Sequence, residues 1–134
     1  MILIDAGPLV ALIDADDQHH AYCLKVFQGI REPLGTVWPA FTEAMYLLGD
    51  LPSGQNALWE MLARSTFQIL PLTEVDAPRM RVLMRKYADR PMDLADAALV
   101  AVAEREALQK IFTIDKKDFL VYRLHNRLRF KVLP

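Results

Sequence analysis

The chain is poor in the residues that build disulfides and soft-metal centres. Its 134 residues include one cysteine, Cys23, and three histidines. A single cysteine excludes an intrachain disulfide and a zinc cage of several cysteines, and it fits a reducing compartment. His19 and His20 are adjacent and His125 is far away in sequence, so the histidines give little basis for a metal site.

Long hydrophobic runs and an excess of one charge are also absent. The longest unbroken apolar run, residues 97–103, is far shorter than the ~20 residues of a membrane-spanning helix. The N-terminal apolar stretch has no basic residues before it and already contains Asp5, which argues against a secretory signal. The net charge of −1 marks no general binder of nucleic acid or membranes. We expect a cytoplasmic protein without a membrane segment.

Apolar residues are nevertheless plentiful. A hydrophobic fraction of 53% suffices for a real core, and no repeat or linker divides the chain, so we expect one domain over residues 1–134. The charges are uneven: residues 1–78 hold three basic and ten acidic residues, whereas 79–134 hold thirteen and seven. Either this is an ordinary mixed surface, or the basic half faces an anionic partner.

Short strand-like and helix-like segments alternate along the chain, with Gly and Pro between them. Strands are predicted at residues 2–4, 36–38, 67–70, 111–114 and 130–133. Helices are predicted at 8–13, 18–28, 40–48, 54–63, from 78 onward, and at 92–103. Asp17 and Ser53 are the expected N-caps of two helices, and Gly29 and Gly49 the expected stops. This alternation predicts an α/β fold with a mostly parallel sheet covered on both faces.

Two of the predicted strands end at an aspartate. Asp5 follows the strand at 2–4, and Asp115 follows the strand at 111–114. In an open α/β sheet, sites lie beyond the carboxyl ends of the strands. Each residue alone could equally cap a following turn or helix. That simpler explanation is weaker for both together.

Other carboxylates stand in segments that are otherwise apolar. Glu43 is the only charge in residues 40–48, so it must reach solvent at the helix edge, in a first turn favoured by the helix dipole, or else pair with a cation or bind a metal. Asp93 and Asp96 share one face at the start of an apolar helix, where the first suits an N-cap and the second a capping box. Asp118 repeats the three-residue spacing after Asp115.

Converging carboxylates would repel one another and hold protons unless a cation lay between them. Mg²⁺ and Mn²⁺ prefer oxygen ligands and keep water molecules that can serve a reaction. Such a site suits attack of a metal-activated water on a phosphodiester. The carboxylates in question are Asp5, Glu43, Asp96 and Asp115, with Asp93 and Asp118 nearby.

The order and spacing of these segments resemble the PIN domain family, especially the VapC-type toxins of toxin–antitoxin pairs. The resemblance lies in Ile2-Leu3-Ile4-Asp5, Thr42-Glu43, Leu94-Ala95-Asp96-Ala97-Ala98-Leu99-Val100-Ala101 and Thr113-Ile114-Asp115-Lys116-Lys117-Asp118-Phe119. It implies a PIN-like three-layer sandwich, a Mg²⁺- or Mn²⁺-dependent endoribonuclease with an RNA substrate, a homodimer, and a cognate antitoxin. By position, Asp5, Glu43, Asp96 and Asp115 would be the catalytic, metal-binding quartet, with Asp93 and Asp118 as further metal candidates.

One departure from the family keeps a rival open. Many relatives place Ser or Thr shortly after the first aspartate, where this chain has Ala6-Gly7-Pro8. That favours a non-catalytic PIN scaffold used for binding, which the set of four acids disfavours. A phosphoacceptor receiver domain would show paired acids at the first strand, whereas Asp5 stands alone. A nuclease also needs basic side chains that contact phosphate, although each of these could be an ordinary solvated surface charge. The candidates are Arg79, Arg85, Lys86, Lys116, Lys117 and Arg123.

Overall fold

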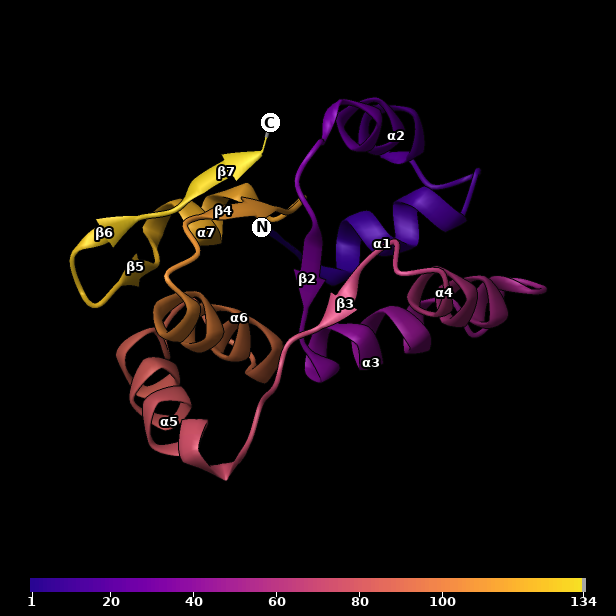
Figure 1. The fold of residues 1–134 in the computed structure, drawn as a ribbon. Helices are drawn as coiled ribbons and strands as arrows, with labels where there is room; N and C mark the ends of the chain where they lie inside the picture. The colour runs from indigo at the N-terminus through magenta and orange to yellow at the C-terminus, as the bar shows by residue number, and fades with distance from the viewer. Residues whose placement is uncertain (134) are drawn as a thin grey trace.

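A parallel sheet forms the middle of the molecule. The computed structural model describes residues 1–133. The sheet has the strand order β3-β2-β1-β4-β7, and every neighbouring pair is parallel (Figure 1). Its strands are β1 (Ile2–Ile4), β2 (Leu34–Thr36), β3 (Gln68–Ile69), β4 (Lys110–Phe112) and β7 (Lys131–Leu133). From β1 the chain first adds β2 and β3 on one side and later β4 and β7 on the other. The carboxyl end of β1 therefore lies at the point where the strand order reverses, which is where α/β folds bind ligands.

Helices cover both faces, which gives three layers. Along β1, Leu3 packs into one hydrophobic core, whereas Ile2 and Ile4 pack into the other, as the two-residue period of a strand requires. The helices on the Ile2 and Ile4 face are α1 (Ala6–Ile13), α2 (His20–Gly29), α3 (Trp38–Leu47) and α4 (Gly54–Ala63). Those on the Leu3 face are α5 (Ala77–Lys86), α6 (Leu94–Glu106) and α7 (Lys116–Val121). The predicted α/β class with a parallel central sheet is confirmed.

Several predicted boundaries are wrong by a few residues. The strand predicted at 36–38 is β2 at Leu34–Thr36, because Pro39 draws Trp38 into the first turn of α3. The strand predicted at 111–114 ends at Phe112. Helix α6 begins after Asp93 rather than at 92 and continues to Glu106. Gly49 does not end α3, which stops at Leu47.

Of two predicted N-caps, one is wrong and the other is right in position but makes no capping hydrogen bond. Asp17 accepts the N–H of His19 at 2.8 Å, and α2 starts only at His20, without a side-chain cap. Ser53 lies at the N-cap position of α4 but has a positive φ of 62° and makes no capping hydrogen bond. Asp17 therefore belongs to the turn before α2, whereas the carbonyl of Ser53 accepts the N–H of Ala57 at the start of α4.

The C-terminal region holds two elements that were not predicted. Helix α7 follows Asp115, and a hairpin pairs β5 (Arg123–Leu124) with β6 (Leu128–Arg129). His125 and Asn126 in the hairpin turn have φ of 51° and 60°, the left-handed region that tight hairpins use. Because these positions hold no glycine, the usual sequence signal of a hairpin turn is missing here.

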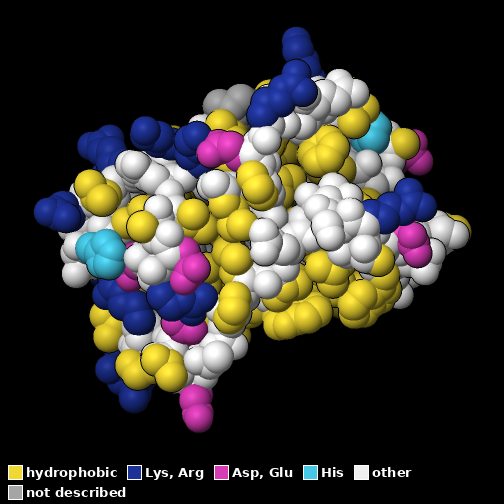
Figure 2. Space-filling model, in the orientation of Figure 1, with side chains coloured by type: hydrophobic (Ala, Val, Ile, Leu, Met, Phe, Trp, Pro, Cys, Tyr) yellow, Lys and Arg dark blue, Asp and Glu magenta, His cyan; other side chains and the backbone are white. Residues whose placement is uncertain are grey.

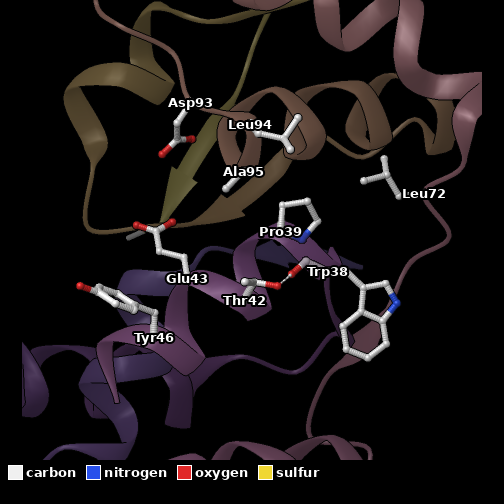
Figure 3. A pocket seen from close by; sticks show the side chains of 9 residues that line it. All are labelled: Trp38, Pro39, Thr42, Glu43, Tyr46, Leu72, Asp93, Leu94 and Ala95. Atoms are coloured by element: carbon white, nitrogen blue, oxygen red, sulfur yellow. Dashed lines mark hydrogen bonds between the residues drawn. The ribbon is translucent and has the colours of Figure 1, made fainter. Parts of the chain in front are cut away.

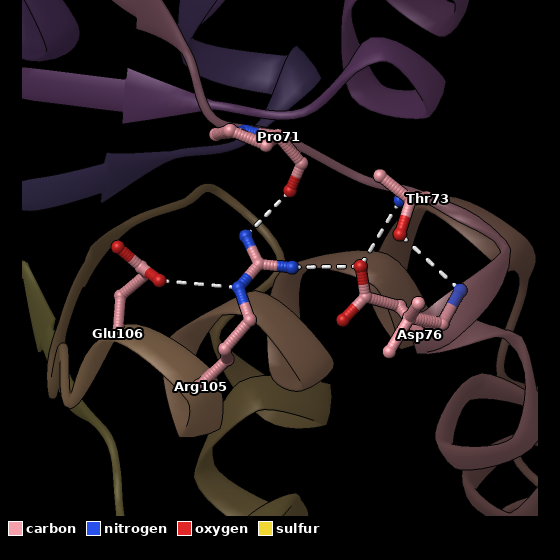
Figure 4. Close-up of polar contacts among 6 residues, drawn as sticks. Pro71, Thr73, Asp76, Arg105 and Glu106 are labelled. Atoms are coloured by element: carbon pink, nitrogen blue, oxygen red, sulfur yellow. Dashed lines mark hydrogen bonds and ion pairs between the residues drawn. The ribbon is translucent and has the colours of Figure 1, made fainter.

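Ion pairs fix the C-terminal end of α6 to α5 and to the segment that precedes α5. Arg105 donates from Nη1 to Oδ2 of Asp76 at 2.7 Å and from Nη2 to the carbonyl of Pro71 (Figure 4). Asp76 ends the short 3₁₀ helix η1 (Glu74–Asp76), which Thr73 caps. Arg79 forms two hydrogen bonds with the buried Glu104, at 2.7 and 2.8 Å. Within residues 1–133, none of the helices has the length and apolar character needed to cross a membrane.

Candidate active site

Carboxylates from four segments meet at the edge of the sheet where β1 and β4 end. They surround a cavity of about 340 Å³. Its lining residues are Asp5, Gly7, Glu43, Asp93, Asp96, Ile114 and Asp115. Five of these seven are acidic, and no lysine or arginine is among them. The sequence-predicted quartet is therefore brought together, with Asp93 beside it.

Asp5 is held by hydrogen bonds to both carboxylate oxygens. Its Oδ1 accepts the N–H of Ala6 at 2.8 Å, so the residue is indeed the N-cap of α1. Its Oδ2 accepts the hydroxyl of Thr113 at 3.0 Å. Burial raises the pKa of Asp5 against these two hydrogen bonds, and the charge of Asp93 adds to the rise. The capping role and a place in the cavity coexist in one side chain.

Asp93 and Asp96 have different partners although they share the start of α6. Oδ1 of Asp93 accepts the N–H of Asp96 at 2.8 Å, which makes Asp93 the N-cap. Asp96 is buried, and its Oδ2 accepts the hydroxyl of Tyr122 at 2.8 Å. Burial, reinforced by the charges of Asp5 and Asp93, raises the pKa of Asp96 to about 8. A carboxylate so strongly perturbed by like charges is typical of functional sites.

Glu43 reaches the cavity from α3, and its setting differs from the sequence prediction. It is the sixth residue of the helix, so its predicted place in the first turn is wrong, although it does reach solvent as that prediction required. The helix is not buried all round either, because Glu43 and Tyr46 are exposed. The carboxylates of Glu43 and Asp93 point toward each other (Figure 3). Desolvation raises the pKa of Glu43, and the charges of Asp5, Asp93 and Asp115 raise it further.

Asp115 and Asp118 complete the acidic group. The N–H of Asp115 donates to Oγ1 of Thr113 at 3.0 Å. Carboxylate oxygens of Asp96, Asp115 and Asp118 all lie within 4.8 Å of one another. Burial, and then the neighbouring Asp118, raises the pKa of Asp115 to about 6. Asp118 also accepts a hydrogen bond from Nε of Arg90 at 3.0 Å, so it has a cationic partner that the quartet lacks.

The donor set fits a hard divalent ion. All candidate ligands are carboxylate oxygens, as Mg²⁺ and Mn²⁺ prefer. The cavity wall supplies no cation to offset their charges. A buried carboxylate without a cation keeps a proton, whereas a divalent ion would allow the acids to ionise together.

Most of the candidate phosphate contacts are occupied by other partners. Arg79 is bound to Glu104, and Arg123 donates to the carbonyls at the end of α7. Lys86 donates to Asn126. Lys116 lies over the ring of Tyr22 at 5.1 Å and donates to its hydroxyl.

Two candidates have no polar partner at all among the described residues. Arg85 and Lys117 make no ion pair or side-chain hydrogen bond with any described residue. Lys117 comes two positions after Asp115, which lines the acidic cavity. Figure 2 shows Lys and Arg gathered over the hairpin, β7 and α5. The basic half of the sequence therefore also forms a region of the surface.

Sequence reasoning missed three side chains that hold the acids in place. Thr113, Tyr122 and Arg90 contact Asp5, Asp96 and Asp118 respectively. Thr113 supplies to Asp5 a hydroxyl of the kind that residues 6–8 lack, and a Cβ on Gly7 would lie 3.1 Å from Cδ1 of Ile114. The sequence places Thr113 in a strand and in a segment that resembles the family, but it gives Thr113 no contact with Asp5. The three-residue spacing of Phe119 and Tyr122 was the available indication that Tyr122 faces inward.

Comparison with known proteins gives three findings. The family model described as PIN domain matches residues 2–123. Ribonuclease VapC26 of Mycobacterium tuberculosis is 25% identical over 135 residues, covering 99% of this chain and all of the relative. The crystal structure of VapC20 of the same species, described as a Sarcin-Ricin loop cleaving toxin, superposes with a TM-score of 0.79 at 16% identity, over 88% of this chain and 94% of that one. With this family match over nearly its whole length, the chain belongs to the PIN domain family.

Proposed function

We propose that this chain is a divalent-metal-dependent endoribonuclease and the toxin of a toxin–antitoxin pair, acting as a single domain of residues 1–134 in the cytoplasm. The observation that carries the proposal is the cavity with five carboxylates and no basic side chain in its wall. Membership of the PIN domain family supports a nuclease, and the similarity to Ribonuclease VapC26 supports RNA as the substrate.

The proposed ligands are Asp5, Glu43, Asp96 and Asp115, with Asp93 and Asp118 as outer members of the group. A bound Mg²⁺ or Mn²⁺ supplies an activated water and offsets negative charge on the phosphodiester. Thr113 holds Asp5 and the backbone of Asp115 in place. Lys117 provides a free positive charge for the RNA backbone beside the acids.

The proposal is tested by metal binding and by cleavage together. We expect protein stripped with EDTA to gain thermal stability in Mg²⁺ or Mn²⁺, because the ion relieves a repulsion present mainly in the folded state. A ligand at 100 times its dissociation constant adds about 2.7 kcal/mol to the free energy of unfolding. RNA should be cut only when the metal is restored. An unchanged melting temperature across millimolar Mn²⁺, with no cleavage, would favour the non-catalytic scaffold.

The exposed apolar surface supports a protein partner. Trp38, Tyr46 and Trp59 are 48, 83 and 50% exposed. Beside the acidic cavity, a larger hollow of about 850 Å³ shares Glu43 and Asp93 with it and is otherwise mostly apolar (Figure 3). Figure 2 shows hydrophobic side chains along the edge over α3. Surfaces of this kind mark interaction sites.

We assign this surface to a homodimer and to a cognate antitoxin encoded nearby. Sedimentation that shows only monomer at high concentration would count against the dimer. A genome with no small adjacent gene would count against the antitoxin. Neither result bears on whether the acids bind metal.

A further inference from the structure

Tyr122 is a fully buried tyrosine whose hydroxyl contacts Asp96, one of the acids that line the cavity. It follows α7 directly and is 0% exposed. Its ring packs edge to face against Tyr87, with centroids 4.9 Å apart, and against Phe119, at 5.1 Å. Its hydroxyl donates to Oδ2 of Asp96 at 2.8 Å. The rings on either side leave the hydroxyl little freedom to move.

The hydrogen bonds around Asp96 divide its two oxygens. Oδ2 is occupied by Tyr122. Oδ1 accepts no hydrogen bond from residues 1–133. It is also not one of the fully buried polar atoms without a partner in these residues, so it is accessible. Oδ1 is therefore the oxygen that remains for a ligand. Asp93 fixes the backbone of Asp96 through its N–H, at 2.8 Å. Tyr122 thus holds the side chain of Asp96, and Asp93 holds its backbone.

We propose that Tyr122 is a positioning residue that presents the Asp96 carboxylate to the metal ion. The inference rests on the proposed function, since it concerns the same centre. A carboxylate that is fixed before binding loses less rotational freedom when it becomes a ligand. Partners that orient a ligand in this way typically change metal affinity or activity by about 10- to 100-fold when removed.

Tyr87 provides a matched control. It is also a buried tyrosine, it packs against Tyr122, and its hydroxyl accepts the backbone N–H of Arg123 at 3.1 Å. Its hydroxyl has no contact with a carboxylate among the described residues. Tyr122→Phe and Tyr87→Phe therefore each remove one buried hydroxyl from the same aromatic group, and only the first removes a contact with Asp96.

The experiment is a calorimetric titration of EDTA-stripped protein with Mn²⁺ at one fixed pH, for the wild type and both variants. We expect Tyr122→Phe to weaken Mn²⁺ binding by about tenfold and Tyr87→Phe to leave it within about twofold. In cleavage assays at limiting metal, kcat should fall for Tyr122→Phe. KM for RNA should stay unchanged, because Tyr122 is fully buried and cannot contact RNA.

The outcomes separate this inference from the proposed function. Wild-type Mn²⁺ affinity retained in Tyr122→Phe would overturn the positioning role and leave the nuclease standing. Equal losses in both phenylalanine variants would show a merely structural contribution and would also overturn it. A wild type that binds no Mn²⁺ would overturn both. Melting temperatures of the metal-free variants check that each phenylalanine protein is folded.

Discussion

The two ends of helix α6 carry buried carboxylates with opposite surroundings. At the C-terminal end, Glu104 binds Arg79 and the neighbouring Asp76 binds Arg105. Burial pushes the pKa of Glu104 upward, but hydrogen bonds from Arg79 and from the N–H of His125 bring it below its usual value. A hydrogen bond from the N–H of Thr73, aided by Arg105, lowers the pKa of Asp76.

The N-terminal end has no such compensation. Asp96 meets Asp5, Asp93 and Asp115, and burial with these like charges raises its pKa. Carboxylates that serve the fold are neutralised within it, because an unpaired buried charge destabilises. Those at the other end line a cavity whose wall holds no cationic side chain, as the proposed binding site for a cation would require. The comparison predicts opposite responses to mutation, pH and salt.

The largest effect is expected from removing one charge at the N-terminal end. Asp96→Asn should lower metal-dependent RNA cleavage by about 100-fold or more. The metal-free protein should keep or gain stability, because a repulsion is relieved. Cleavage rates and melting temperatures of Asp96→Asn and Asp93→Asn, measured side by side, check this.

Asp93→Asn is the matched control, because asparagine caps a helix about as well as aspartate. It should therefore change cleavage and stability less than Asp96→Asn does. The opposite ranking, with the Asp93 variant inactive and the Asp96 variant active, would place the family's ligand one helical turn earlier than we do.

At the C-terminal end, the same kind of change should harm the fold and spare the chemistry. Arg79→Met leaves Glu104 buried without its guanidinium, which should lower the free energy of unfolding by about 2 kcal/mol. Urea denaturation measures this loss. Cleavage by the folded variant should match the wild type, and a strong loss of cleavage would mean that Arg79 contacts RNA after all.

The pH dependence of stability should follow the raised pKa values. A carboxyl group whose pKa is higher in the folded state stabilises the fold while it stays protonated, and this stabilisation is lost as the pH rises through the folded pKa. With Asp115 at about 6 and Asp96 at about 8, the free energy of unfolding in EDTA should fall between pH 5 and 9. Urea melts at several pH values measure the slope, and Asp96→Asn should flatten it. A flat wild-type profile would contradict the unpaired state of these acids.

The smallest effect concerns the free positive charges. RNA binding should weaken with salt, and Lys117→Gln should reduce the slope of log affinity against log salt by about 1. Lys25→Gln, on the exposed surface of α2 in the acidic half of the chain, is the control and should leave the slope unchanged. Equal slopes for all three proteins would remove Lys117 from the RNA contacts.

The sequence predicted the α/β class and the residues that converge, because both depend on local pattern. Asp5 follows a three-residue apolar strand, and Asp96 opens a helix with apolar residues on all sides. It could not predict which carboxylates find a cation, since Arg79 and Glu104 are 25 positions apart and Arg90 and Asp118 are 28 apart. The prediction that Glu43 lies in a fully buried helix was wrong for a similar reason, because the exposure of α3 depends on which helices pack against it.

The hydrogen bond between Thr113 and Asp5 joins positions 108 apart in the chain. During synthesis, the ribosome therefore adds Thr113 108 residues after Asp5, and Asp115 two residues later still. A growing chain that has not yet formed β4 lacks one of the two strands that pair with β1, and it also lacks Asp115, which follows β4. The cavity is therefore assembled only after β4 has been translated and has paired with β1.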